Sequence, residues 1–366
     1  MKIYFKKIFI IFLLSFIFFL ALDAIFGKYV YKKFIKEDLI DVDTTQLSAK
    51  DEVYDHTFSK NFKGIVGWGN ERYEFCSDNN GFRISCTKKN KNQKKYDIGF
   101  LGDSFTEGTG LVYEDTFVGI LEKKLPNKKI ANLGVSSYSP AIYYTKIKKL
   151  LETGYQFNEI IVFLDISDLV DDALCYQVIN NKIIRKKTYD YCFNNFNSQN
   201  NKLFDFFEKN FKLSKIFIDL ILNRDPIDKK NIQEQLNHSR SEWTYNYKKK
   251  IFQNFDYDKT SSISLKHMQD LYLLLNNRSI KLSVAVYPWP GTLRFDKPEN
   301  TQVKLWRDFC NNKCSNFYNF MPKFFSEIEG KDFYETYKKF YIEGDIHFNR
   351  YGNEIIANEF ILKYKN

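Results

Sequence analysis

The hydrophobic and polar positions alternate regularly only in the later part of the chain. There, short apolar runs predict buried strands at residues 96–101, 129–133, 159–164 and 281–287. Between and after them, apolar residues at helical spacing predict helices at residues 116–124, 140–153, 262–276 and 351–364. Alternating strands and helices predict an α/β fold, in which helices cover both faces of a central parallel sheet.

The stretch before the first of these strands is irregular and predicts a separate small region. Residues 64–83 are rich in aromatic residues and glycine, and the Asn-Gly pair at 80–81 is a tight-turn signal. Two strands of a small hairpin fit this pattern. We therefore expect a stalk and hairpin region at 28–95, followed by an α/β domain at 96–366.

Residues 171–260 interrupt the alternation within that domain. They are polar, aromatic and lysine-rich, and they are too long for a plain loop. We interpret them as an inserted, mainly helical segment over the sheet edge, with one helix predicted at 204–222. A lid or substrate surface and a functionally neutral elaboration both agree with this composition.

The N-terminus carries a short basic segment and then a long apolar run. Three lysines lie within residues 1–7, and residues 8–22 are apolar apart from Ser15. Extended to Phe26, the run approaches the roughly 20 residues that span a bilayer. No small-x-small cleavage site follows, so we expect a signal-anchor over residues 1–27, with the bulk of the chain periplasmic or extracellular. A cleaved signal peptide is the alternative.

The 6 cysteines fall into three close pairs. An even number in local pairs on an exported chain is typical of disulfides. We expect bonds Cys76–Cys86 and Cys175–Cys192, whereas Cys310 and Cys314 would form a strained bond if both lay on one helix. None of the six has the spacing of a metal ligand, and we expect no metal or cofactor.

The formal net charge of +10 raises the question of an acidic partner. The sequence contains no zinc spacing, aromatic-basic repeat or arginine-rich arm, so nucleic acid is not an expected partner. The densest basic stretch, residues 88–95, is typical of a solvated loop. An acidic-polymer binder remains an alternative that rests on net charge alone.

One serine and one histidine stand out as candidate catalytic residues. Ser104 follows the first predicted strand within Gly102-Asp103-Ser104-Phe105-Thr106-Glu107-Gly108, where glycines allow a sharp turn and backbone amides can face an oxyanion. His347 lies just before the last predicted helix, two residues after Asp345. A nucleophilic serine needs a base and an orienting acid, and this pair supplies both residue types.

Four segments in this order resemble the SGNH/GDSL hydrolase superfamily, in particular its membrane-anchored, alginate acetyltransferase-like members. The first and last are the Ser104 heptapeptide and Asp345-Ile346-His347, and the second and third are residues 132–140 and 163–168. Residues 80–83 and 287–290 are similar as well. The resemblance implies a flavodoxin-like three-layer α/β/α sandwich and a triad of Ser104, His347 and Asp345.

The resemblance also implies where an oxyanion would bind. The donors would be the backbone N–H of Ser104, the second segment (Gly134 and Ser137) and the hydroxyl of Ser167. The family usually has glycine at the place of Ser137 and asparagine at that of Ser167. A backbone donor at Ser137 survives this change if its φ stays negative, whereas the shorter hydroxyl of Ser167 is a weaker substitute for an amide.

These features together predict an ester hydrolase for O-acyl esters, with O-acetyl as the expected group and an acylated envelope carbohydrate as the expected substrate. One alternative is an O-acetyltransferase that modifies an extracytoplasmic polysaccharide and receives its acyl group from a membrane partner. Another is an envelope binding protein whose catalytic site is degenerate, which the Ser137 and Ser167 changes would favour.

Overall fold

The computed structural model describes residues 2–30, 46–69, 71–88, 93–189, 210–211, 213–214, 239–246, 256–330 and 332–364. The chain divides into two units. The N-terminal unit comprises Met1–Val42 and Asn197–Lys230, and the main unit comprises Asp43–Phe196 and Asn231–Asn366.

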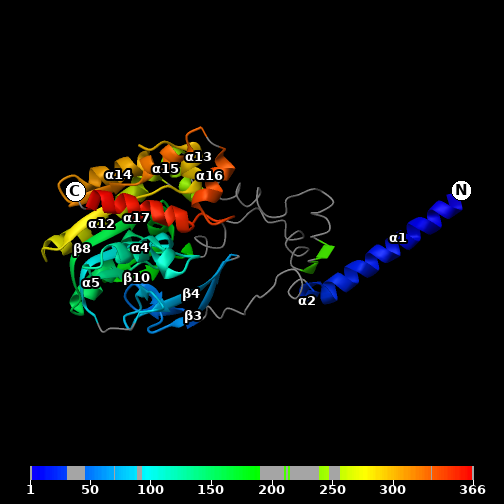
Figure 1. Ribbon diagram of the computed structural model, residues 1–366, viewed down its shortest axis with the longest axis horizontal. Coiled ribbons are helices and arrows are strands. Elements are labelled where there is room, and N and C mark those ends of the chain that lie inside the picture. Colours follow the sequence, from blue (N-terminus) through cyan, green and yellow to red (C-terminus); the bar gives the residue numbers. More distant parts are fainter. Residues whose placement is uncertain are drawn as a thin grey trace. The chain divides into compact units, whose positions relative to one another are not determined.

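The main unit is built on a central sheet with helices packed beside it (Figure 1). In the described part of the chain this sheet has 8 strands. Its parallel strands are β6 (Lys95–Leu101), β7 (Ile130–Asn132), β8 (Gln156–Leu164), β11 (Lys281–Val286) and β12 (Asn316–Asn319). They lie in the order β12-β11-β8-β6-β7. All except β12 are predicted by the sequence. That strand is a short Asn-Phe-Tyr-Asn segment, with too few apolar residues to give a strand signal.

Helices cover both faces of the parallel strands. The four predicted from periodicity are α4 (Phe117–Lys124), α5 (Pro140–Glu152), α12 (Tyr257–Asn276) and α17 (Arg350–Tyr364). The connection from β6 through α4 leads to β7 on one side, and the connection from β7 through α5 returns to β8 on the other. Because such crossovers are right-handed, α4 and α5 cover opposite faces. Since α17 packs beside α4 and α12 beside α5, the predicted α/β sandwich is confirmed.

The predicted hairpin region continues this sheet. Strands β3 (Lys63–Trp68), β4 (Glu71–Ser77) and β5 (Arg83–Ile84) are antiparallel, and β5 pairs with β7 through Arg83 and Asn132. The expected boundary at residue 95 therefore runs through one continuous sheet. The pairing places residues of the hairpin near the carboxyl end of β6, where parallel sheets bind ligands.

The remaining elements of the main unit are short. The helices are α3 (Ser104–Glu107), α6 (Asp168–Leu174), α11 (Trp243–Asn246), α13 (Pro290–Phe295), α14 (Thr301–Cys310), α15 (Met321–Ile328) and α16 (Phe333–Phe340), with 3-10 turns at Tyr113–Asp115 and Ser239–Ser241. Two hairpins pair β1 (Ser48–Asp51) with β2 (Asp55–Phe58) and β9 (Tyr176–Ile179) with β10 (Lys182–Arg185). The described part of the insertion thus contains a β-hairpin. The helix predicted at 204–222 lies almost wholly outside the described residues.

Two of the three cysteine pairs are bonded in the described residues. A disulfide joins Cys76 to Cys86, as expected from their spacing. A second joins Cys310 to Cys314, with Cα atoms 4.7 Å apart. The two cysteines do not lie on one helix, because α14 ends at Cys310 and the chain turns before Cys314. Cys175 is disulfide-bonded, and its expected partner Cys192 lies outside the described residues.

The N-terminal unit contains the predicted apolar helix. It runs through α1 (Lys2–Leu22), a π-helical turn (Asp23–Gly27) and α2 (Lys28–Val30). Within it, Lys6–Gly27 has a mean hydropathy of 2.8 and is long and apolar enough to cross a membrane. The carboxylate of Asp23 is buried and accepts hydrogen bonds from the backbone of Leu213 and Ser214. Part of the insertion therefore packs on the end of this helix.

Candidate active site

Ser104 stands at the sharp turn between β6 and α3. The Asp103 carboxylate caps α3 by accepting a hydrogen bond of 3.0 Å from the Phe105 N–H. Glycine is required at position 102, since a Cβ there would lie 2.1 Å from the Thr106 hydroxyl oxygen. Ser104 itself is half-buried.

The structure brings the three predicted triad residues together. His347 Nε2 lies 2.7 Å from Ser104 Oγ, although 243 positions separate the two residues. Its Nδ1 lies 2.5 Å from Asp345 Oδ1, which also accepts a 2.8 Å hydrogen bond from the His347 backbone N–H. This is the order of groups that serine hydrolysis uses: nucleophile, base and orienting acid.

Two aromatic residues that the sequence analysis did not identify hold Asp345 in place. Trp68, the last residue of β3, donates its indole N–H to Asp345 Oδ2 over 2.6 Å, and its ring meets the His347 ring edge-on at 5.2 Å. The Tyr337 hydroxyl accepts the Asp345 backbone N–H at 2.8 Å. Both contacts join segments far apart in sequence, so no local pattern marks these residues.

The charges of the triad support a proton-accepting His347. Burial alone would raise the pKa of Asp345, but the His347 ring and its hydrogen bonds lower it to about 2. Burial alone would lower the pKa of His347, but the adjacent Asp345 carboxylate raises it above its ordinary value. The Asp345 carboxylate therefore stabilises positive charge on the His347 ring.

Residues from the third segment and from 287–290 form a buried polar cluster behind Ser104. Asp165 Oδ2 accepts hydrogen bonds from the Tyr287 hydroxyl at 2.9 Å and the Trp289 indole at 2.7 Å. Burial, together with the nearby Asp165 charge, raises the pKa of Asp103 well above its ordinary value. A negative charge on Asp103 is therefore penalised by its surroundings beside Ser104.

The predicted oxyanion donors are arranged differently from the expectation. The Gly134 N–H donates to the Asn132 side chain at 3.0 Å, so it does not supply an oxyanion donor. Gly134 serves close packing instead, because a Cβ there would lie 2.5 Å from the Glu107 nitrogen. The Ser167 hydroxyl is buried and donates to Asp171 at 3.4 Å, which takes it away from an oxyanion.

The condition of a negative φ at Ser137 is not met, so the use of its N–H as a donor depends on the contacts that hold the loop. Its φ is +66°, a left-handed backbone that costs a non-glycine residue about 1–2 kcal/mol. This backbone suits glycine better than serine, so neighbouring contacts must hold the loop in place. One of them is Glu107, whose Oε2 accepts hydrogen bonds from the Ser136 N–H at 2.7 Å and its hydroxyl at 2.6 Å.

Comparisons with known proteins give distant structural matches. No family model matches the sequence, and no curated protein matches it. A lipolytic G-D-S-L family member from Veillonella parvula has a TM-score of 0.39 and 13% identity, over 74% of this chain and 98% of that chain. An acetylxylan esterase mutant from Geobacillus stearothermophilus has a TM-score of 0.40 and 10% identity, over 75% and 96%. The SGNH-hydrolase family esterase AlinE4 has a TM-score of 0.35 and 13% identity, over 75% and 97%.

These structures include members of the superfamily that the sequence segments resemble. Their low identities and TM-scores carry no argument about the chemistry of this chain. The functional conclusion therefore rests on the triad and its surroundings.

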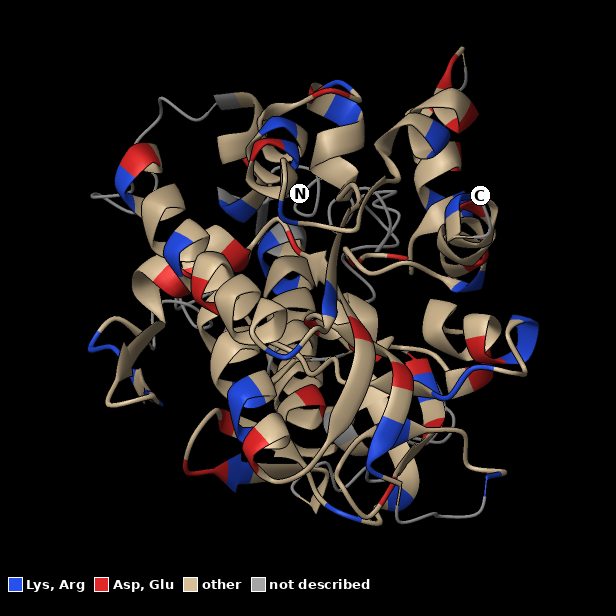
Figure 2. Ribbon diagram, turned by 90° about the vertical axis from the view of Figure 1, so that its left-hand side faces the viewer, with Lys and Arg blue, Asp and Glu red and all other residues tan. Residues whose placement is uncertain are grey.

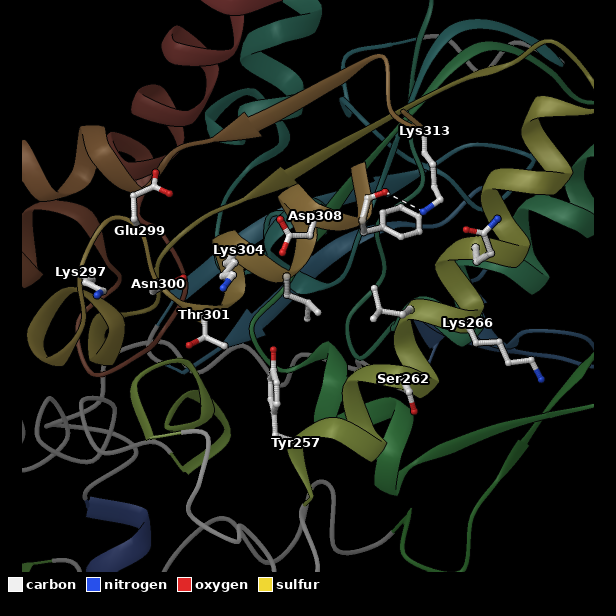
Figure 3. A pocket seen from close by; sticks show the side chains of 14 residues that line it. Tyr257, Ser262, Lys266, Lys297, Glu299, Asn300, Thr301, Lys304, Asp308 and Lys313 are labelled. Carbon is white, nitrogen blue, oxygen red and sulfur yellow. Dashed lines mark hydrogen bonds between the residues drawn. The ribbon is translucent and has the colours of Figure 1, made fainter. Parts of the chain in front are cut away.

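An open groove of about 950 Å³ lies elsewhere on the main unit, between α12 and residues 297–313 (Figure 3). Its lining mixes four lysines with Glu299 and Asp308, and it includes none of the triad residues. Figure 2 likewise shows Lys and Arg interspersed with Asp and Glu along the described helices and strands. The charge pattern of the described residues thus gives no added support to an acidic-polymer binder.

Proposed function

We propose that the chain is an SGNH-type serine ester hydrolase that cleaves O-acyl esters, with an O-acetyl group on an envelope carbohydrate as the expected substrate. The observation that carries the proposal is the continuous hydrogen-bond chain from Ser104 through His347 to Asp345. A half-buried serine bonded to a buried, carboxylate-paired histidine is the arrangement that nucleophilic acyl transfer requires.

In the proposed reaction, Ser104 Oγ attacks the ester carbonyl while His347 Nε2 takes the hydroxyl proton. The new imidazolium is stabilised by Asp345, and the tetrahedral oxyanion is bound by the backbone N–H groups of Ser104 and Ser137. His347 then returns the proton to the leaving alcohol as the C–O bond breaks. Water then attacks the acyl-serine while His347 takes one of its protons. His347 returns this proton to Ser104 Oγ as the acyl C–Oγ bond breaks, which releases the carboxylic acid and restores the serine.

The proposed location is outside the cytoplasm, with the Lys6–Gly27 helix as a membrane anchor. The length and hydropathy of this helix and the two disulfides of the main unit support it. Transfer of the acyl group to a sugar hydroxyl would use the same acyl-serine, but it would require an acyl donor from a membrane partner. We favour hydrolysis because water is always present as the acceptor.

The test measures p-nitrophenyl acetate hydrolysis by the full-length chain in detergent. We expect Ser104→Ala and His347→Ala to lower kcat by at least about a thousandfold. Ser262→Ala, on the exposed side of α12, is the matched control and should keep wild-type turnover. A fluorophosphonate probe should label the wild type and not Ser104→Ala. Full turnover by Ser104→Ala, or no labelling of the wild type, would contradict the proposal.

A further inference from the structure

A second histidine, His56 on β2, contacts the loop that carries Ser137. Its Nδ1 lies 2.8 Å from Asp55 Oδ2, and its Nε2 lies 2.8 Å from the backbone carbonyl oxygen of Ser136. A carboxylate and a carbonyl oxygen are both acceptors, so both ring nitrogens must donate a proton. Only the charged imidazolium has two N–H groups.

The surroundings keep Asp55 ionised. The Arg185 guanidinium binds it with both arms, at 2.8 and 2.9 Å. Burial alone would raise the pKa of Asp55, but His56 and Arg185 lower it well below its ordinary value. Other titratable groups surround His56. Lys50 pairs with it across the β1–β2 hairpin, and the Tyr138 ring packs against its ring. Glu107 binds Ser136, and Tyr176 interacts with the Asp55–Arg185 pair.

The bond to the Ser136 carbonyl has a direct consequence for Ser137. The Ser136 C=O and the Ser137 N–H belong to one trans peptide, so they point in opposite directions. Holding the carbonyl against His56 therefore aims the Ser137 N–H away from His56. A flip of this peptide would reverse both groups and remove the donor that the proposed reaction needs.

The loop requires such a contact, because Ser137 has the left-handed backbone that disfavours serine. His56 is joined to the loop at a second point, since the Tyr138 hydroxyl donates to the His56 carbonyl oxygen at 2.6 Å. Glu107 holds the Ser136 N–H on the other side of that residue. His56 is the member of this set that binds the carbonyl of the 136–137 peptide.

We infer that His56, in its imidazolium form, is a positioning residue that fixes the 136–137 peptide so that the Ser137 N–H serves as an oxyanion donor. The catalytic part of this inference rests on the proposed function. The structural part, a doubly protonated ring that holds the loop, stands without it.

Three measurements on the full-length chain test the inference. In ¹⁵N-histidine spectra at neutral pH, we expect both His56 ring nitrogens to be protonated, with the signals assigned by their loss in His56→Gln. In hydrogen exchange, the backbone amides of residues 134–139 should exchange at least about tenfold faster in His56→Phe than in the wild type. The increase should be smaller in His56→Gln, because glutamine keeps one N–H donor. The matched control His267→Gln alters a histidine on α12 and should leave this loop unchanged.

In turnover, His56→Phe should lower kcat by about ten- to a hundredfold with KM changed less than threefold, and His56→Gln should recover part of the loss. A ring with a single proton, or unchanged loop protection in a folded His56→Phe protein, would overturn the inference. So would an unchanged kcat. If the wild type proves to have no esterase activity, the proposed function fails, and the ring and exchange measurements still decide whether His56 holds the loop.

Discussion

The contact between Trp68 and Asp345 offers a sharp test of how the hairpin supports the triad. Trp68→Phe removes the indole N–H that donates to Asp345 Oδ2 at 2.6 Å and keeps an aromatic ring near His347. Asp345 Oδ1 retains both of its hydrogen bonds to His347. The substitution therefore removes one hydrogen bond to the Asp345 carboxylate and leaves its hydrogen bonds to His347 in place.

The structure sets the size of the effect. A hydrogen bond to a charged group contributes about 1.5–3 kcal/mol. Trp68 is 37% exposed, so water can replace part of this bond, and we expect a loss of about 1 kcal/mol. Since about 1.4 kcal/mol corresponds to a tenfold rate change, kcat/KM should fall about fivefold.

The change should also move the pH profile in a definite direction. Without the indole donor, the Asp345 carboxylate carries more uncompensated charge and stabilises the His347 imidazolium more strongly. The pKa of His347, already raised, then rises further. Because the base must be neutral to accept the serine proton, the acidic limb of activity should move to higher pH.

The assay measures kcat/KM for p-nitrophenyl acetate at pH values from about 4 to about 9. Ile65→Ala, at an exposed position on the same strand β3, is the control for damage to the strand. Identical profiles for Trp68→Phe and wild type would refute the reasoning. A limb that moves to lower pH would show that the indole acts on His347 in the opposite sense.

Three further predictions concern the backbone donor, a buried lysine and the hairpin. Ser137→Gly should keep kcat within about threefold, because only the N–H is needed, whereas Ser137→Pro should abolish turnover. Burial lowers the pKa of Lys146 from 10.5 to about 7. Between these pH values the unfolded chain binds more protons than the folded chain, so the free energy of unfolding should rise with pH. In urea unfolding from pH 7 to 9, the wild type should gain stability relative to Lys146→Met, by at most about 1.4 kcal/mol per pH unit. A protein of residues 43–366 should hydrolyse the ester, and one of residues 96–366 should be inactive, as measured by the same assay.

The sequence identifies the candidate triad residues, which the fold brings together, because their signals are local. The turn around Ser104 and the Asp345–His347 pair each occupy a few neighbouring residues, and the strand periodicity places the turn at the end of a strand. The fold brings the two segments into contact across 243 positions. The supporting residues have no such signal, since Trp68 and His56 act only through segments that the fold brings near.

The predicted oxyanion donors show a second limit of prediction from the sequence. A residue's place in a family pattern gives its position along the chain, but not the direction of its N–H or hydroxyl. Gly134 and Ser167 stand at the expected places and direct these groups to Asn132 and Asp171. Which group can bind an oxyanion depends on φ and on long-range partners, and the sequence states neither.

Residues of the two hairpins before β6 form hydrogen bonds with three separate parts of the candidate site. Arg83, fully buried, donates to the carbonyl oxygens of Glu107 at 2.6 Å and Gly108 at 2.7 Å, and so fixes the end of the helix that begins with Ser104. Trp68 donates a hydrogen bond to the Asp345 carboxylate, and His56, on the β1–β2 hairpin, contacts the Ser136 carbonyl oxygen. A buried guanidinium bonded to carbonyls is costly to rearrange. The residues before β6 therefore hold the turn at Ser104, the Asp345 carboxylate and the 136–137 peptide in place, and so they support the candidate site directly.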